Sequence, residues 1–327
     1  MSKIKGLLLT IGIALLATLL GRFFPIIGSA IFAMVIGMLL NNMLQLPNSF
    51  KPGIQFSNKK ILHYSIILLG FTLSFKSIGT VGLQSLPILI VTLLTAFIVV
   101  TLIVKWLKID LHTGILIGVG TSICGGSAIA ATSPVIKAKE EVIAFSLSTV
   151  FLFNLVAVII FPPLGHLFHM SQEAFGFFSG TAINDTSSVV AASALYGSKA
   201  LEVATIVKLT RTLFIVPITI GLALWMAKKQ PSSYAHEQRQ IWQLIPNFII
   251  WFILASLIST FLNFSEDVIA IFKQASLFFI TIALAGVGLS VKFNQFKRAG
   301  IKPILLGFIV WASLIITSLI ILSIIKI

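Results

Sequence analysis

Two stretches of small and hydroxyl-bearing residues interrupt apolar segments of this chain, and their chemistry suits ligand binding. One begins at Gly120 and the other at Gly180, and they align without gaps at an offset of 60. Polar groups and loosened backbone survive at membrane depth where they are buried in protein or line a wet cavity. We therefore expect both breaks to form one substrate site. Its candidate residues are Thr121, Ser122, Cys124, Gly125, Gly126, Ser127, Asn184, Thr186, Ser187 and Ser188.

Asp185 lies in the second break and is the one acidic residue of nine placed deep in an apolar segment. An ionised carboxylate there is costly unless it is paired or hydrated, so the residue is predicted to be functional. It would carry a coupling proton or coordinate Na⁺. A compatible interpretation is that Asp185 caps a half-helix starting near Thr186.

Two basic residues, Lys208 and Arg211, lie three positions apart inside a later apolar segment and share a helical face. They are the natural charge partners of Asp185 or of an anionic substrate. We predict that Arg211 binds substrate and that Lys208 acts with Asp185 in ion coupling. Snorkelling of Lys208 to the membrane interface is the alternative.

The remaining polar residues suggest no further chemistry. Asn154 is a lone amide in an apolar segment and is predicted to bond a neighbouring helix. No Cys, His or acidic cluster has metal-ligand spacing, so we predict neither a metal site nor a cofactor. Cys124 lacks a nearby histidine and is not expected to be a nucleophile.

The composition is that of a membrane protein. Of 327 residues, 57% are hydrophobic and 10% are charged, with a mean hydropathy of +1.08, whereas soluble domains carry about 25% charged residues. The net charge of +14 comes from residues in short connectors, which indicates membrane topology rather than nucleic-acid binding. We expect a single transmembrane domain over 1–327.

Apolar runs long enough to cross the bilayer define about 9–11 membrane elements in an all-α polytopic fold. The first run is as long as a spanning helix and is expected to be retained. Lys and Arg counts place the N-terminus in the cytoplasm, with 14 inside against six outside. The eleven runs are 4–23, 26–44, 61–79, 83–104, 112–136, 141–163, 174–196, 204–227, 241–262, 267–290 and 302–325.

A second repeat favours a transporter. Residues 70–76 match residues 286–292 at an offset of 216, which also carries Pro87 onto Pro303 at the head of the next apolar helix. The copies start on opposite sides of the membrane, as in the inverted repeats of secondary transporters.

The two repeats conflict if every element spans the membrane, because 112–136 and 174–196 would then be parallel. Two re-entrant hairpins, entering from opposite sides and meeting at the midplane, remove the conflict. They also raise the number of Lys and Arg residues on the cytoplasmic side to 16, against four outside. The alternative is a spanning but broken helix that crosses a partner. Both remain open.

Several motifs resemble the YeiH-type family of bacterial inner-membrane proteins, which carries the family label of sulfate exporter. They are 121–131, 134–136 with 140–142, 184–191 and 206–211. The resemblance implies a place among the cation–proton antiporters and anion transporters, with inverted repeats, broken helices and a mobile transport unit. The Gly-Gly break is also similar to the crossing helix of bile-acid sodium symporters. One departure is Asn184 before Asp185, where family members often have His, so proton coupling through residue 184 is not expected.

These observations predict a secondary transporter of a small anion, sulfate-like or a sulfonate, exporting it with H⁺ or Na⁺ as coupling ion. The protein would lie in the bacterial plasma membrane, with a homodimer as a possible assembly. A cation–proton antiporter using Asp185 is the second hypothesis. An intramembrane hydrolase pairing Ser127 with Lys208 is the third, and it requires a hydrogen bond between them.

Overall fold

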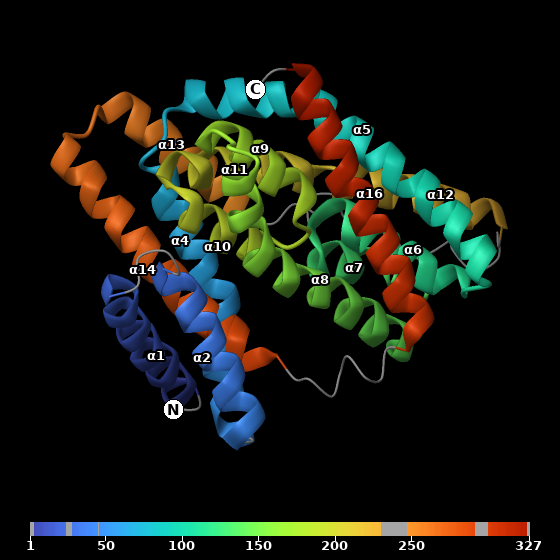
Figure 1. Cartoon of the computed structure of the whole chain (residues 1–327), viewed down its shortest axis with the longest axis horizontal. Coiled ribbons are helices and arrows are strands. Elements are labelled where there is room, and N and C mark those ends of the chain that lie inside the picture. Colours follow the sequence, from blue (N-terminus) through green and yellow to red (C-terminus); the bar gives the residue numbers. More distant parts are fainter. Residues whose placement is uncertain (1–2, 24–27, 45, 230–246, 292–299, 326–327) are drawn as a thin grey trace.

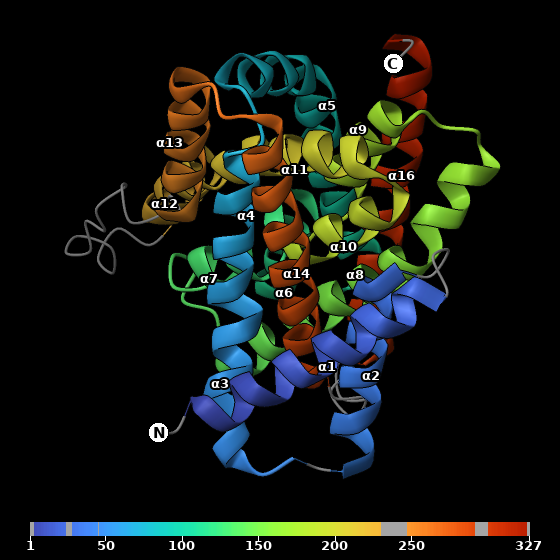
Figure 2. The ribbon, with the colours of Figure 1, turned by 90° about the vertical axis from the view of Figure 1, so that its left-hand side faces the viewer.

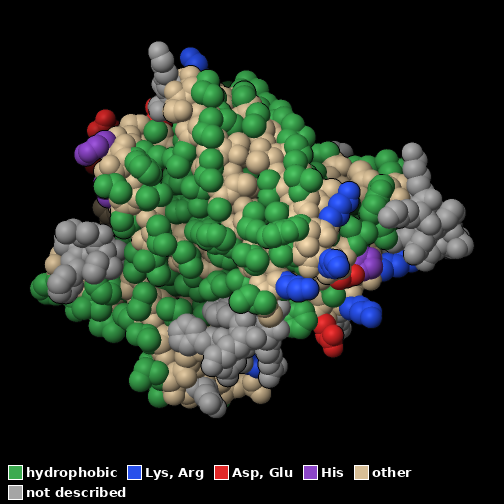
Figure 3. Space-filling view, turned by 45° about the vertical axis from the view of Figure 1, so that its right-hand side comes forward, with side chains coloured by type: hydrophobic (Ala, Val, Ile, Leu, Met, Phe, Trp, Pro, Cys, Tyr) green, Lys and Arg blue, Asp and Glu red, His purple; other side chains and the backbone are tan. Residues whose placement is uncertain are grey.

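The chain is an all-α polytopic membrane protein, seen in a computed structural model (Figure 1). Every element of the described part of the chain is helical. Six stretches there are long and apolar enough to span a membrane, including Ile4–Phe23, Phe75–Leu107 and Ile301–Ile325. Hydrophobic side chains cover most of the face in Figure 3, with charged side chains mostly toward its margins. The structure describes residues 3–23, 28–44, 46–229, 247–291 and 300–325.

A first bundle holds the N-terminal helices together with two helices from late in the chain (Figure 2). Helix α14 packs against α2, α4 and α1, and α13 packs against α4. The helices are α1 (Ile4–Phe23), α2 (Gly28–Leu44), α3 (Lys51–Phe56), α4 (Leu62–Gly70), α13 (Asn247–Leu262) and α14 (Glu266–Ser290).

A second bundle contains both predicted breaks. Its pairs include α9 with α11, α5 with α16, and α10 with α8. The helices are α5 (Phe75–Leu107), α6 (Leu111–Val119), α7 (Gly126–Thr132), α8 (Glu140–Leu167), α9 (Gln172–Ala182), α10 (Thr186–Tyr196), α11 (Ser198–Leu213), α12 (Ile215–Lys229) and α16 (Ile301–Ile325).

The run predicted at 61–79 is divided differently. Helix α3 continues through a wide π-helical turn, η2 (Ser57–Ile61), into α4, so this stretch is helical from Lys51 to Gly70. A new helix starts at Phe75, where the Ser74 side chain accepts a hydrogen bond from Ser77 N. The expectation that Lys59 and Lys60 belong to a connector is therefore wrong, because both lie within this helix.

Three prolines also lie elsewhere than expected. Pro87 is inside α5 rather than at a helix head, whereas Pro303 is in the first turn of α16. Pro162 and Pro163, at the end of the predicted run 141–163 where a turn would follow, lie inside α8, which continues to Leu167. The repeated segments nevertheless pack in pairs, α4 against α14 and α5 against α16. The inverted repeat itself stays a prediction, and its residues 292–299 lie outside the described part of the chain.

The second break is a re-entrant hairpin. The hydroxyl oxygens of Ser179 in α9 and Ser193 in α10 lie 2.9 Å apart. At the other end of the same two helices, Tyr196 Oη donates to Met170 O at 2.6 Å. The helices therefore run side by side in opposite directions, with the chain reversing at residues 183–185.

The first break is a hairpin as well. Helix α6 widens into a π-helical turn, η3 (Gly120–Cys124), and the chain reverses at Gly125 before α7. A Cβ built on Gly120 would lie 2.8 Å from Ile129 Cδ1, and Leu116 shares an apolar cluster with Ile129. A broken helix that continued straight would hold these residues apart, so the crossing-helix alternative does not describe this fold.

Helix α8 joins the bases of the two hairpins. It has 28 residues, which makes it about 42 Å long. Because it leads from the end of the first hairpin to the start of the second, the hairpins enter from opposite ends and point toward its middle. Asn154, near the midpoint of α8, contacts the second tip.

Candidate functional site

The tips of the two hairpins touch. Gly125 has φ +67°, a conformation that L-residues with side chains rarely adopt. A Cβ built on it would lie 3.4 Å from Asp185 Cβ and 3.7 Å from Asn154 Nδ2. The structure thus brings the two predicted breaks together, at the middle of α8.

Lys208 joins the tips from α11. Its Nζ donates to Ile123 O at 2.7 Å, at the end of η3, and to Ile183 O at 3.0 Å, after the end of α9. Each acceptor belongs to a different hairpin. The side chain is completely buried, so the alternative that Lys208 snorkels to the interface is wrong.

Arg211 makes the same connection one helical turn further along α11. It is also completely buried, and the described residues offer it no carboxylate within ion-pair distance. Its guanidinium therefore binds backbone of both hairpins instead of Asp185. The acceptors are Ser122 O (from Nε, 2.6 Å), Thr121 O (from Nη2, 2.7 Å), Thr181 O (from Nη1, 2.5 Å) and Ile183 O (from Nη1, 3.2 Å).

These bonds neutralise two helix ends. The last carbonyls of a helix lack intrahelical partners and carry a partial charge of about −0.5. Both η3 and α9 end in the protein interior, where unsatisfied carbonyls would be costly. Lys208 and Arg211 supply donors and charge, and Trp311 Nε1 adds a bond to Ala182 O at 3.2 Å. The two cations thus hold the tips in place, a role that the sequence did not suggest.

Asp185 is the N-cap of α10, which confirms one of its two predicted roles. Its Oδ2 accepts hydrogen bonds from Ser187 N at 3.0 Å and from the Ser187 hydroxyl. Asn154 Oδ1 accepts from Asn184 N and Asp185 N, both at 3.1 Å. The predicted interhelical bonding of Asn154 is therefore confirmed, and it fixes the second tip to α8.

Several polar atoms behind the tips have no partner in the described structure. They are Thr121 Oγ1, Ser122 Oγ and both side-chain heteroatoms of Asn184. These residues are at most 1% exposed. Buried polar groups are normally hydrogen-bonded, and exceptions call for a ligand, an ion or ordered water.

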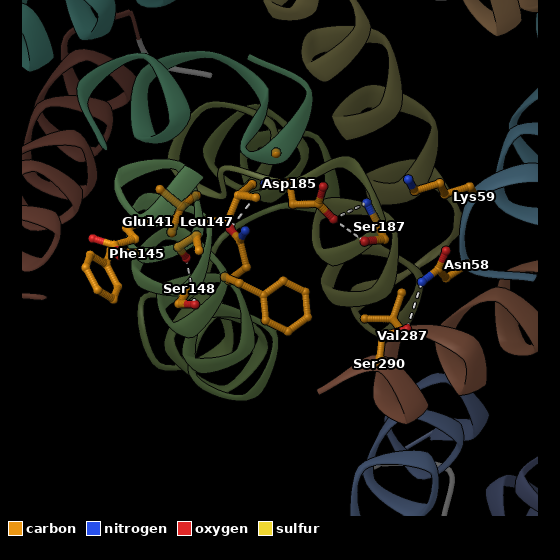
Figure 4. A pocket seen from close by; sticks show the side chains of 15 residues that line it. Asn58, Lys59, Glu141, Phe145, Leu147, Ser148, Asp185, Ser187, Val287 and Ser290 are labelled. Atoms are coloured by element: carbon orange, nitrogen blue, oxygen red, sulfur yellow. Dashed lines mark hydrogen bonds between the residues drawn. The ribbon is translucent and has the colours of Figure 1, made fainter. Parts of the chain in front are cut away.

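A cavity of about 990 Å³ opens between the bundles and reaches the tips (Figure 4). One wall is a face of α8 from Glu141 to Asn154, which spans about 20 Å of helix. The opposite wall comes from η2 and α14, and includes Asn58, Lys59 and Ser290. Gly126, Asp185 and Ser187 of the tips complete the lining.

The cavity therefore runs from one end of α8 to its middle. Beyond Asn154, toward the C-terminal end of α8, the interior is filled by aromatic side chains. Phe161 stacks on Phe178 and on Trp311, with centroids 4.7 and 5.8 Å apart. The site is open to one side and closed by packed aromatic side chains on the other.

The predicted site residues divide into three groups. Gly126, Asp185 and Ser187 line the cavity, while Thr121, Ser122, Cys124 and Asn184 lie buried behind it. Thr186 and Ser188 belong to the first turn of α10, and Ser127 is exposed on α7. The bonds of Lys208 Nζ go to carbonyls, and none of them reaches Ser127.

Sequence reasoning missed the far wall of the cavity. The apolar run that starts at Ile61 predicts a connector position for Lys59, and the wide turn η2 that contains it leaves no clear signal in the sequence. Glu141 and Ser290 were treated as helix ends. Asn154 was recognised as a lone amide, and that same signal could have placed it at the site.

Helical hairpins that enter from both ends of α8 and meet at a one-sided cavity define a multi-pass, all-helical membrane protein with two re-entrant segments. The chain belongs to the UPF0324 family of membrane proteins. The matching family model, described as conserved hypothetical protein 698, covers residues 5–307.

Relatives in this family are similar along their whole length. A UPF0324 membrane protein of Streptococcus pyogenes serotype M6 is 48% identical over 324 residues, which cover 97% of this chain and 96% of the relative. One from Fusobacterium nucleatum is 41% identical over 338 residues, 97% of each chain. No solved structure matches this chain.

Proposed function

We propose that this protein is a secondary active transporter of a small anion, a sulfate-like oxyanion or a sulfonate, exported with H⁺ or Na⁺ as coupling ion. The observation that carries the proposal is the cavity that leads from one end of α8 to two hairpin tips and stops there. A site at mid-depth with access from a single side is the arrangement that alternating access requires.

The charges near the tips favour an anion. Lys208 and Arg211 bring two buried positive charges, and the helix ends that they bind offset only about half of this. Asp185, when ionised, supplies the remaining negative charge. Neutralising Asp185 by a proton, or by Na⁺ bound to its free oxygen, leaves the tips electropositive. A coupling ion on Asp185 would thus promote anion binding.

A cation–proton antiporter is the second candidate, and one observation favours it. Two carboxylates, Asp185 and Glu141, line the same cavity. In that case Asp185 would exchange a monovalent cation for a proton.

Transport in proteoliposomes separates the two. The purified protein is reconstituted, and uptake of labelled sulfate and sulfite is measured under an imposed anion, pH, Na⁺ or K⁺ gradient. The anion proposal predicts uptake that needs an anion gradient and is stimulated by a pH or Na⁺ gradient. Asp185→Asn retains a side-chain cap on α10 and is expected to abolish that stimulation. Proton flux driven by Na⁺ or K⁺, without any anion dependence, would support the antiporter instead.

A further inference from the structure

The anion proposed above needs a positive group that faces the cavity, and Lys208 and Arg211 do not provide one. Neither lines the cavity, both are completely buried, and each is bound to carbonyls of the hairpins. Lys59 is the only Lys or Arg among the described residues that line it. Figure 4 shows its ammonium group directed across the cavity toward Asp185 and Ser187.

The backbone of Lys59 is held firmly in place. Lys59 lies in the wide turn η2, and wide turns of this kind are frequent at functional sites. Its neighbour Asn58 donates from Nδ2 to Ser290 Oγ at 2.9 Å, which ties η2 to α14. Gly286 permits this close approach, because a Cβ there would lie 2.9 Å from Asn58 N. The side chain, in contrast, is exposed to the cavity and has no ion pair with a described residue.

A second group faces the same space from the other bundle. Asn154 is 2% exposed and lines the cavity. Its Oδ1 accepts two backbone bonds from the second tip, but no described residue accepts from its Nδ2. An amide nitrogen that lines a cavity without a protein acceptor is a group that a ligand oxygen could accept from.

We propose that Lys59 Nζ and Asn154 Nδ2, on opposite walls of the cavity, are the donors that bind the transported anion, a small oxyanion. This inference rests on the proposed function and replaces Arg211 as the substrate-binding cation. Charged hydrogen bonds from an ammonium and neutral ones from an amide are a common combination for oxyanions. Since Lys59 belongs to the first bundle and Asn154 to the second, the bound anion would bridge them.

Direct binding measurements test this proposal. Potassium sulfate is titrated into the purified protein in detergent at constant ionic strength, with sulfite and acetate in parallel. Lys59→Gln is expected to weaken binding of the preferred anion about tenfold or more. Lys60→Gln is the matched control, because Lys60 is adjacent, exposed and outside the cavity lining, and it should bind within about twofold of wild type.

Asn154→Asp gives independent evidence. It keeps the Oδ1 acceptor for the two tip N–H groups, removes the Nδ2 donors and places a carboxylate beside Asp185. The protein that stays folded should lose anion binding, and its melting temperature should fall because the new carboxylate is buried; anion binding as tight as that of wild type would contradict the role of Asn154. If wild type binds none of the anions, the proposed function fails. If wild type binds and Lys59→Gln binds as tightly as Lys60→Gln, this inference is overturned while the proposed function stands.

Discussion

Gly125 lies so close to Asp185 that a Cβ on the glycine would meet Asp185 Cβ at 3.4 Å and Asp185 Cα at 3.5 Å. These two residues, 60 apart in sequence, are the point where the hairpin tips touch. The positive φ at Gly125 makes the first tip sensitive to any side chain at that position.

Gly125→Ala is therefore expected to destabilise the tip. A non-glycine residue at φ +67° costs on the order of 1–3 kcal/mol, and this backbone strain is the cause, because the added methyl group itself would make only an ordinary contact with Asp185. The melting temperature in detergent should fall, and transport should be lost. Gly126→Ala is the control, since its Cβ would have only an ordinary contact, 3.5 Å from Leu147 Cδ2. Equal melting temperatures for the two variants would contradict this account of the tip.

Arg211 is expected to be a stability residue. Arg211→Leu would remove the hydrogen-bond donor of the buried carbonyl oxygens of Thr121, Ser122 and Thr181. The unfolding free energy should fall by about 3 kcal/mol or more. Arg211→Lys cannot restore the branched set of bonds and should also be strongly destabilised.

The control lies in the same helix. Lys199 has an exposed ion pair with Glu202 at 3.8 Å, so Lys199→Gln should change the unfolding free energy by no more than about 0.5 kcal/mol. Chemical unfolding in detergent measures all three variants. An Arg211→Leu protein as stable as Lys199→Gln would show that the carbonyl bonds contribute little.

The hairpin of α9 and α10 can be tested by cross-linking. With Cys124 replaced by Ala, the pair Ser179→Cys and Ser193→Cys should form a disulfide on mild oxidation, because the native hydroxyls are 2.9 Å apart. In one continuous helix the two positions would be about 21 Å apart, and no disulfide could form. The pair Ser171→Cys and Ser187→Cys is the negative control, with one residue at the base and one at the tip. Loss of free thiol, measured on intact membranes, reports the result.

Asn184 separates binding from stability. Its side chain is completely buried, and neither heteroatom has a partner among the residues that the structure describes. Replacing an unsatisfied buried amide by an apolar group of similar volume is neutral or stabilising. Asn184→Leu should therefore keep or raise the melting temperature, while the stabilisation of wild type by an anion or by Na⁺ disappears. A lower melting temperature would indicate a structural bond that this conformation does not contain.

Much of the fold was predictable because lipid imposes strong rules on composition. Eleven apolar runs and two polar breaks follow from hydropathy and from the cost of unsatisfied groups in hydrocarbon. The hairpin geometry was one of two open alternatives, since spacing alone does not reveal whether a chain reverses at Gly125 or continues.

The roles of the charged residues were harder to predict. The sequence placed Lys208 and Arg211 inside an apolar segment and predicted carboxylate or anion partners for them. Their true acceptors are carbonyls, which every residue possesses and which become special only where two helices end together. Lys59 was missed for a related reason, because the wide turn that directs it inward depends on packing against α14.

The bonds that Lys208 and Arg211 make to both hairpins have a mechanical consequence. Separating the tips would strip two buried cations of their acceptors, so in the transport cycle proposed above the two tips would move as one rigid unit. Opening of the closed side would then come from sliding of that whole unit along α2 and α14. Among the described residues, the short turn at Phe71–Ser74 connects one bundle to the other, and bending there would accompany this movement.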